Sequence, residues 1–118
     1  MISSTIELEQ HGNLVVATIS TSYMTHPEMQ ELIEMLQQKM RYDNANHFVL
    51  DMTTVAYLSS ACIGELVAFL QDLEHVRGRI ALANCQPDVA FLFRVTRLDT
   101  VFSLCADVNK AKEHLNPA

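Results

Sequence analysis

The chain has 118 residues, of which 49% are hydrophobic and 19% charged, and its formal net charge is -6. This length suits one ordinary domain over residues 1–118, and the apolar share is too high for a disordered chain. An acidic surface repels phosphates, so we expect neither nucleic acid nor an anionic membrane as a partner. Because no apolar run is long enough to span a bilayer and Met1 to Gln10 lacks a signal-peptide pattern, we expect a cytoplasmic protein without membrane insertion.

The first part of the chain predicts a hairpin followed by a helix. Two β-like runs, Ser4–Glu9 and Leu14–Ser20, flank a His-Gly-Asn turn signal, which is typical of an antiparallel hairpin. Thr25 and Glu28 then have the spacing of a capping box at the start of a helix. Apolar residues recur behind them at helical spacing up to the polar stretch Asp43–Asn46, namely Met29, Leu32, Ile33, Leu36 and Met40.

The rest of the chain alternates strands and helices. Phe48–Leu50 is a short apolar run without alternation, which suits a strand buried on both faces. Apolar residues at helical spacing follow Ser59-Ser60 and stop before Gly78, a typical C-terminal glycine of a helix. The pattern then predicts a strand, a helix, a strand and a helix over Arg79–Asn84, Pro87–Val95, Thr100–Leu104 and Ala106–Leu115. The order β-β-α-β-α-β-α-β-α predicts an α/β fold with a mixed, mostly parallel sheet of about five strands and helices packed on it.

The stretch Ser59-Ser60-Ala61 is the most informative part of the sequence. Sites on parallel sheets gather beyond the carboxyl ends of the strands, and here that edge holds Asp51 and the approach to Ser59. A serine at the start of a helix is an ordinary N-cap, because its oxygen accepts a hydrogen bond from a free backbone N–H. The same position favours an anion, since a helix N-terminus carries a partial positive charge. A phosphate there would leave the fold intact while adding charge and bulk that block a close-fitting partner.

Two segments carry a family resemblance. Val49-Leu50-Asp51 ends an apolar strand, Ser59–Gly64 opens the next helix with the sequence Ser-Ser-Ala-Cys-Ile-Gly, and Leu98–Phe102 follows further on. This order resembles the STAS domain of anti-sigma factor antagonists, in which an Asp-Ser-Ser-Gly-Leu-Gly-like motif follows such a strand and a Gly-Leu-Asp-x-Val-Phe segment precedes the last strand. The resemblance covers nearly the whole chain and implies a STAS-like fold. It places Ser60 on the phosphorylated serine of the family, with Ala61 an ordinary variant.

The chain departs from the family pattern at three positions. Ser59 stands where the family often has Asp, Cys62 replaces a Gly of the motif, and Arg97 replaces the Gly of the downstream segment. A register shifted by one residue would make Ser59 the acceptor. Ser60 is therefore the first choice for phosphorylation and Ser59 the second.

The resemblance implies a phospho-regulated protein-binding module and not an enzyme. Its unphosphorylated form would bind an anti-sigma factor or a histidine-kinase-like serine kinase, phosphorylation of Ser60 would block binding, and a PP2C-type phosphatase would restore it. The expected partner-binding residues are Asp51, Ser59, Ser60, Ala61 and Gly64. The alternative is a constitutive STAS scaffold subunit that binds a transporter ATPase or a signalling assembly, and the replacement of the motif Asp by Ser59 favours it.

We expect neither a cofactor nor a metal. The three cysteines, Cys62, Cys85 and Cys105, are widely spaced and form no CxxC motif, so we expect reduced, buried thiols. The five histidines are scattered without a metal-ligand spacing, which indicates surface residues. With only three glycines there is no phosphate-binding glycine loop, and no Ser/His/Asp order suggests nucleophilic catalysis.

Overall fold

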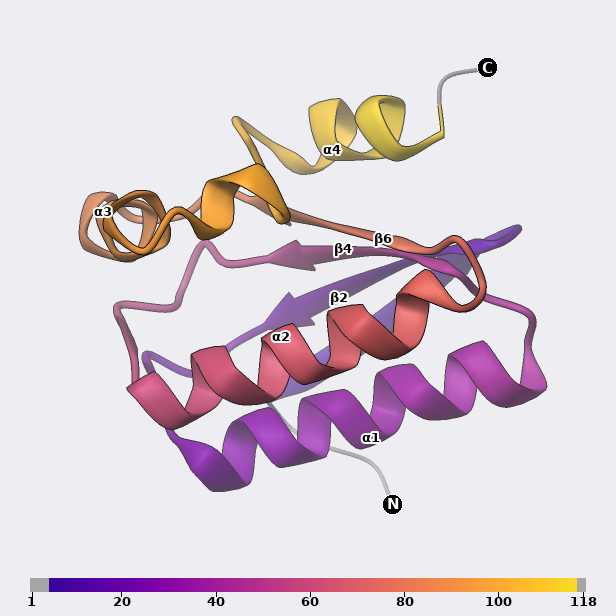
Figure 1. The fold of residues 1–118 in the computed structure, drawn as a ribbon, viewed down its shortest axis with the longest axis horizontal. Coiled ribbons are helices and arrows are strands. Elements are labelled where there is room, and N and C mark those ends of the chain that lie inside the picture. The colour runs from indigo at the N-terminus through magenta and orange to yellow at the C-terminus, as the bar shows by residue number, and fades with distance from the viewer. Residues whose placement is uncertain (1–4, 117–118) are drawn as a thin grey trace.

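The computed structural model describes residues 5–116, and its larger sheet has five strands in the order β1-β2-β4-β6-β7 (Figure 1). β1 (Ile6–His11) and β2 (Leu14–Ile19) form the predicted antiparallel hairpin. The remaining neighbours pair in parallel: β2 with β4 (His47–Asp51), β4 with β6 (Arg79–Ala83), and β6 with β7 (Ser103–Cys105). The predicted mixed, mostly parallel sheet is confirmed. Ser4, where the first strand was predicted to begin, lies outside the described residues.

Helices cover both faces of this sheet. α1 (His26–Tyr42) and α2 (Ser60–Glu74) lie side by side against one face, whereas α4 (Val108–Leu115) lies against the other (Figure 1). α3 (Pro87–Val95) lies beyond the carboxyl ends of the strands, toward the start of α2. The α1 and α2 helices and the bounds of α3 agree with the sequence prediction.

The central strands are buried on both faces. Successive side chains of a strand point to opposite sides, so each strand contributes to two cores. Val15, Phe48 and Leu50 belong to the larger core on the side of α1 and α2, and Leu14 and Val49 to the smaller core under α4. This arrangement explains why the predicted β4 run is apolar without alternation.

The segment before the last strand differs from the prediction. Thr100 was predicted to begin that strand, but Leu98–Thr100 forms a short 3-10 helix and β7 begins at Ser103. The Thr100 N–H donates to the carbonyl oxygen of Arg97 at 3.3 Å, so a turn bond replaces a sheet bond. Arg97 has a φ of 61°, in the left-handed region that favours glycine, and it occupies the position where the family pattern has Gly.

The last helix is shorter than the predicted Ala106–Leu115. Its N-cap is Asp107, whose carboxylate accepts a hydrogen bond from the Lys110 N–H at 2.8 Å. An aspartate in this role ends the extended connection and sets the first helical residue at Val108.

A second, two-stranded sheet was not predicted. β3 (Tyr23–Met24) pairs in parallel with β5 (Tyr57–Leu58), between the end of β2 and the start of α2. In each strand the tyrosine is exposed while its neighbour is buried.

Two expectations about titratable side chains need correction. Cys62 is buried as predicted, but Cys85 and Cys105 are only half-buried, and all three are free. Burial raises the pKa of the Cys85 thiol to about 11. His47 is half-buried at the start of β4 rather than exposed, because its strand is central in the sheet.

Candidate partner-binding site

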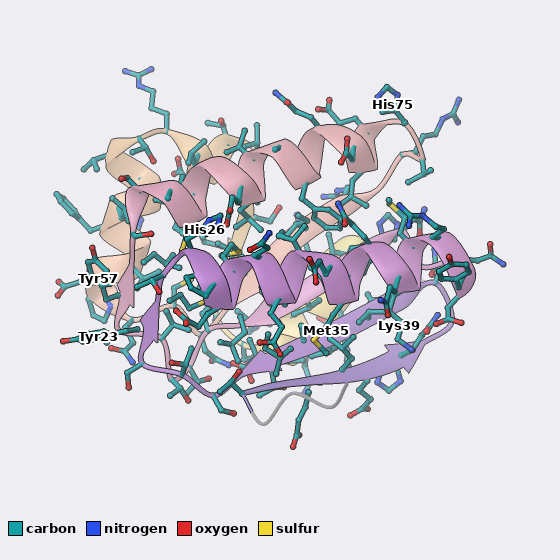
Figure 2. The ribbon with its side chains drawn as sticks, turned by 90° about the horizontal axis from the view of Figure 1, so that it is seen from below. Tyr23, His26, Met35, Lys39, Tyr57 and His75 are labelled. Atoms are coloured by element: carbon teal, nitrogen blue, oxygen red, sulfur yellow. The ribbon has the colours of Figure 1, made fainter. Side chains whose placement is uncertain are left out.

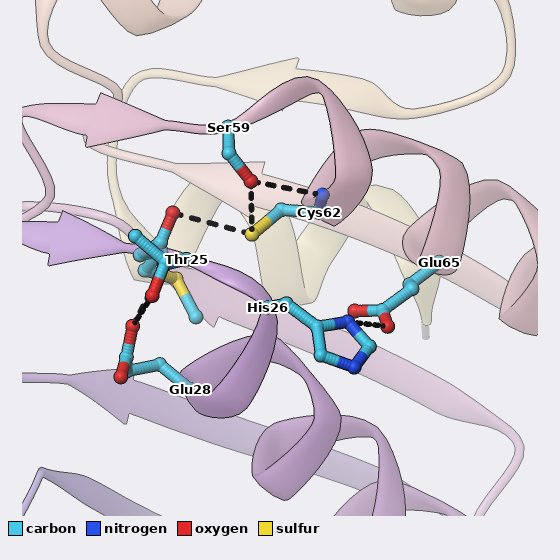
Figure 3. Close-up of polar contacts among 7 residues, drawn as sticks. Thr25, His26, Glu28, Ser59, Cys62 and Glu65 are labelled. Carbon is cyan, nitrogen blue, oxygen red and sulfur yellow. Dashed lines mark hydrogen bonds and ion pairs between the residues drawn. The ribbon is translucent and has the colours of Figure 1, made fainter.

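Ser59 is the N-cap of α2, and its hydroxyl is engaged within the chain. The Oγ atom accepts a hydrogen bond from the Cys62 N–H at 3.3 Å and lies 3.2 Å from the Cys62 Sγ atom, to which it donates (Figure 3). The Cys62 thiol in turn donates to the carbonyl oxygen of Met24 at 3.2 Å, and the Ser59 N–H donates to the same oxygen at 3.2 Å. Ser59 therefore fixes the start of α2 to β3.

Ser60 is the first residue of α2 and is exposed. Ala61 and Gly64 are exposed as well, and a Cβ atom on Gly64 would meet nothing within 4 Å. Residues four apart share one face of a helix, so Ser60 and Gly64 lie on the same side of α2. We call Ser60, Ala61 and Gly64 the α2 outer surface; its side chains are small enough for another backbone to approach closely.

Asp51 holds the end of β4 in place. Its Oδ1 atom accepts hydrogen bonds from the Thr53 N–H at 3.2 Å, from the Thr53 hydroxyl at 2.6 Å, and from the Asn84 side-chain amide at 3.2 Å. The Gln86 side-chain amide donates to the carbonyl oxygen of Thr53 at 2.9 Å. This cluster joins the carboxyl ends of β4 and β6, so the carboxylate is engaged with its own chain. Sequence reasoning singled out Asp51 but missed Asn84, which directly follows β6, and Gln86, which is the N-cap of α3.

A short contact between a histidine and a glutamate side chain links the start of α1 to the second turn of α2. His26 Nδ1 lies 2.5 Å from Glu65 Oε1, and the Thr25 hydroxyl next to it donates to Glu28 (Figure 3). The Thr25 N–H also donates to Glu28, at 2.7 Å, which completes the predicted capping box. The hydrogen bond from the Thr25 hydroxyl lowers the pKa of the Glu28 carboxyl. Glu65 also lines a shallow groove of about 290 Å³ between α1 and α2. Glu34 of α1 and Asp72 of α2 line the same groove. Sequence reasoning placed His26 at the surface but gave no role to Glu65.

The predicted site residues thus separate into two groups. Ser60, Ala61 and Gly64 form one exposed surface, whereas Asp51 and Ser59 use their side chains to position that end of the sheet. Within residues 5–116, no group of histidine, cysteine or acidic side chains is arranged to hold a metal ion. In the same range, no helix is long and apolar enough to cross a membrane.

Residues 5–111 match the family model of the STAS domain. The chain belongs to this family. The fold agrees with solved STAS structures over nearly the whole chain. The anti-sigma factor antagonist SpoIIAA in its unphosphorylated form superposes with a TM-score of 0.82 at 18% identity, covering 96% of this chain and 97% of that one. The Bacillus cell-fate determinant SpoIIAA in its phosphorylated form superposes with a TM-score of 0.73 at 17% identity, covering 94% of this chain and 99% of that one.

An anti-sigma factor antagonist from Mycobacterium paratuberculosis gives a TM-score of 0.78 at 20% identity, covering 94% of this chain and 92% of that one. Similarity at this level of identity establishes the fold and not the partner. The STAS fold of these antagonists is that of a binding module.

Proposed function

We propose that this STAS protein is a phospho-regulated binding module. Its unphosphorylated form binds an anti-sigma factor or a histidine-kinase-like serine kinase, and phosphorylation of Ser60 blocks that binding. The observation that carries the proposal is the difference between two adjacent serines: Ser59 is half-buried and bonded to Cys62, whereas Ser60 is exposed on a surface of small residues. A kinase can reach the Ser60 hydroxyl without disturbing the N-cap.

The phosphoryl transfer proposed for Ser60 is a single displacement. The Ser60 Oγ atom attacks the γ-phosphorus of ATP, the new O–P bond forms as the bond to the β-phosphate oxygen breaks, and ADP leaves. A base of the kinase takes the hydroxyl proton. The chain contributes only the acceptor and its placement, which agrees with a binding module rather than an enzyme.

The position of Ser60 suits a phosphate that acts on binding rather than on folding. A helix N-terminus stabilises an anion, so the added charge of about -1.5 to -2 does not destabilise α2. On the α2 outer surface the same group fills the space into which a partner would fit against Ala61 and Gly64. The solved structures of SpoIIAA in unphosphorylated and phosphorylated forms support the proposal, because a protein of this fold takes a phosphate. A PP2C-type phosphatase would complete the cycle in the cytoplasm.

The direct test is intact-mass measurement and phosphosite mapping of the protein from its native cells, with and without phosphatase treatment. We expect one phosphate, on Ser60. A phosphate on Ser59 would keep the switch and move its position, and the absence of any phosphate under every growth condition would refute it.

The effect on binding is tested with Ser60→Asp against a purified histidine-kinase-like serine kinase of the source organism. We expect the variant to bind the kinase at least about tenfold more weakly than the wild-type chain does, because a carboxylate at this surface opposes a close-fitting partner. The matched control is Asn109→Asp, which adds the same charge at an exposed position of α4, on the other face of the sheet. Equal affinity of Ser60→Asp and Asn109→Asp would count against the switch.

A constitutive scaffold is the second candidate function. It is favoured by Ser59, because the family often has a carboxylate beside the acceptor serine and this chain has a hydroxyl engaged in capping. In that case the α2 outer surface would bind a transporter ATPase or a signalling assembly without phosphorylation. Retention of such a partner by both the wild-type chain and Ser60→Glu in the same cells would favour this function.

A further inference from the structure

Two tyrosines are exposed side by side at the end of the sheet where α2 begins. Tyr23 is 67% exposed and Tyr57 50% exposed, and their rings meet edge to face with centroids 5.6 Å apart (Figure 2). We call them the tyrosine pair. An exposed aromatic pair has no role in the core of this fold, because the buried neighbours Met24 and Leu58 already fill that side of β3 and β5.

The tyrosine pair is held on a well-bonded backbone. The N–H groups of Ala56 and Tyr57 both donate to the carbonyl oxygen of Ser22, at 2.8 and 3.1 Å. β3 is also tied to α2, since the carbonyl oxygen of Met24 accepts hydrogen bonds from Ser59 and Cys62. The backbone that carries the two rings is therefore already ordered. Binding of a partner to the rings costs this chain little conformational entropy.

The tyrosine pair lies a short stretch of chain from the α2 outer surface. β5 leads directly into the cap of α2, so Tyr57 lies three residues before Ser60, which is about 10 Å of extended chain. Tyr42, which is 74% exposed, lies at the opposite end of α1, about 24 Å along the helix axis from His26. Of these three exposed tyrosines, the two near Ser60 form the contacting pair.

We propose that the tyrosine pair anchors the serine kinase that phosphorylates Ser60. This inference rests on the proposed function and adds the docking surface to it. A kinase must hold the Ser60 hydroxyl against its ATP, and small residues at positions 60, 61 and 64 offer little area for binding. Buried aromatic side chains near the centre of an interface supply most of its affinity. The partner surface that fits is an apolar pocket for the two rings with polar groups at its rim for the phenol hydroxyls.

The first experiment replaces Tyr23, Tyr57 or Tyr42 by photoreactive benzoylphenylalanine in the full chain, in its native cells, and identifies the adducts by mass spectrometry. We expect positions 23 and 57 to give the same histidine-kinase-like protein and position 42 to give little of it. Equal adduct from positions 57 and 42 would overturn the proposal. An adduct of position 57 with another class of protein, such as a transporter ATPase, would overturn it as well.

The second experiment measures the affinity of that purified kinase, without ATP, for single variants of the chain. We expect Tyr57→Ala to weaken binding roughly 30-fold, the loss typical of an interface hot spot. We expect Tyr23→Ala to weaken it less, because Tyr57 is the tyrosine that lies three residues before Ser60. Tyr57→Phe should keep most of the affinity, and Tyr42→Ala should leave it unchanged. Thermal unfolding of each variant at the wild-type temperature shows that the fold is intact.

The two proposals fail in different ways. Loss of affinity in Tyr57→Ala with full affinity in Ser60→Asp would keep the tyrosine pair and refute the switch. Full affinity in both Tyr57→Ala and Tyr23→Ala, with weak binding by Ser60→Asp, would keep the switch and refute the anchor.

Discussion

Two glycines near opposite ends of the parallel sheet, Gly78 and Gly64, differ in how closely the chain packs around them. At the amino end, Gly78 lies so close to its surroundings that a Cβ atom there would come 2.3 Å from the carbonyl oxygen of Asn46. The Asn13 side-chain amide also donates to the Asn46 side chain at 2.8 Å, which ties the hairpin to the start of β4. At the carboxyl end, a Cβ atom on Gly64 would meet nothing within 4 Å, and the tyrosine pair and Ser60 are exposed.

This difference separates residues that stabilise the fold from residues that are free to bind. Gly78 is required by close packing, whereas Gly64 weakens its own helix and a Cβ atom there would meet nothing within 4 Å. A residue that costs stability without a packing reason is a candidate for function. Mutations at the amino end should therefore change the free energy of unfolding, and mutations on the outer side of the carboxyl end should change partner binding.

The largest effect on stability is expected for Gly78→Ala. The new methyl group would overlap the Asn46 carbonyl oxygen and the Leu73 side chain, so β6 or the end of α2 must shift. We expect a loss of about 2–3 kcal/mol in the free energy of unfolding, measured by urea denaturation. Gly64→Ala is the control with the same chemical change at an open site. A Gly78→Ala chain as stable as wild type would show that this end of the sheet is not tightly packed.

A smaller effect is expected for Ser59→Ala, at the inner side of the α2 start. It removes the acceptor of the Cys62 N–H and should cost about 1 kcal/mol, or about 4 °C in the melting temperature. Ser60→Ala is the matched control and should leave the melting temperature unchanged, because its side chain is exposed. Equal destabilisation by the two changes would contradict the division between an inner and an outer serine.

Gly64→Ala should raise the stability of the chain while weakening its binding to the partner. Alanine favours a helix interior over glycine by about 0.5–1 kcal/mol, and the open space at this position accepts the methyl group, so the variant should be more stable. The same methyl group on the α2 outer surface should weaken binding of the kinase, because it stands next to Ser60 on one helix face. Calorimetry measures both the stability of the variant and its affinity for the kinase. Tighter or unchanged binding by the stabilised variant would remove Gly64 from the proposed interface.

Most elements of the fold could be predicted because they have strong local signals. The capping box at Thr25 and the proline at the start of α3 mark helix beginnings, and the apolar run at Phe48–Leu50 marks the central strand. The predicted boundary at Gly78 was right for a different reason. The left-handed residue at the end of α2 is Arg77, with a φ of 56°, and Gly78 is needed for its close approach to Asn46.

Only part of the candidate site could be predicted from the sequence. Its serines were found because a helix start has a residue pattern, but the pattern does not say which hydroxyl is engaged; the contact with Cys62 decides that. The bond between Asp51 and Asn84 joins residues 33 positions apart, so no local spacing predicts it. The tyrosine pair was missed because β3 and β5 have two residues each, too few for a periodic pattern.

The smallest effect is expected at the amino end, where His47 makes stability depend on pH. Burial, and then the nearby Arg79 guanidinium, lower the pKa of its imidazole below the ordinary value of 6.5. In the unfolded chain this histidine takes up a proton at higher pH than in the folded chain. The stabilisation from keeping it neutral is therefore complete above about pH 6.5 and is lost as the pH falls below that value toward the folded pKa.

We expect His47→Gln to flatten the fall in melting temperature below about pH 6.5, because the group that gains a proton on unfolding is gone. The matched control is His75→Gln, at an exposed position just past the end of α2. If both variants keep the wild-type slope, His47 is solvated in the folded chain and the amino end of β4 is more open than its packing indicates. If only His47→Gln flattens it, the amino end of the sheet around His47 is its acid-sensitive end, whereas the exposed end around Ser60 is the one proposed to take a phosphate.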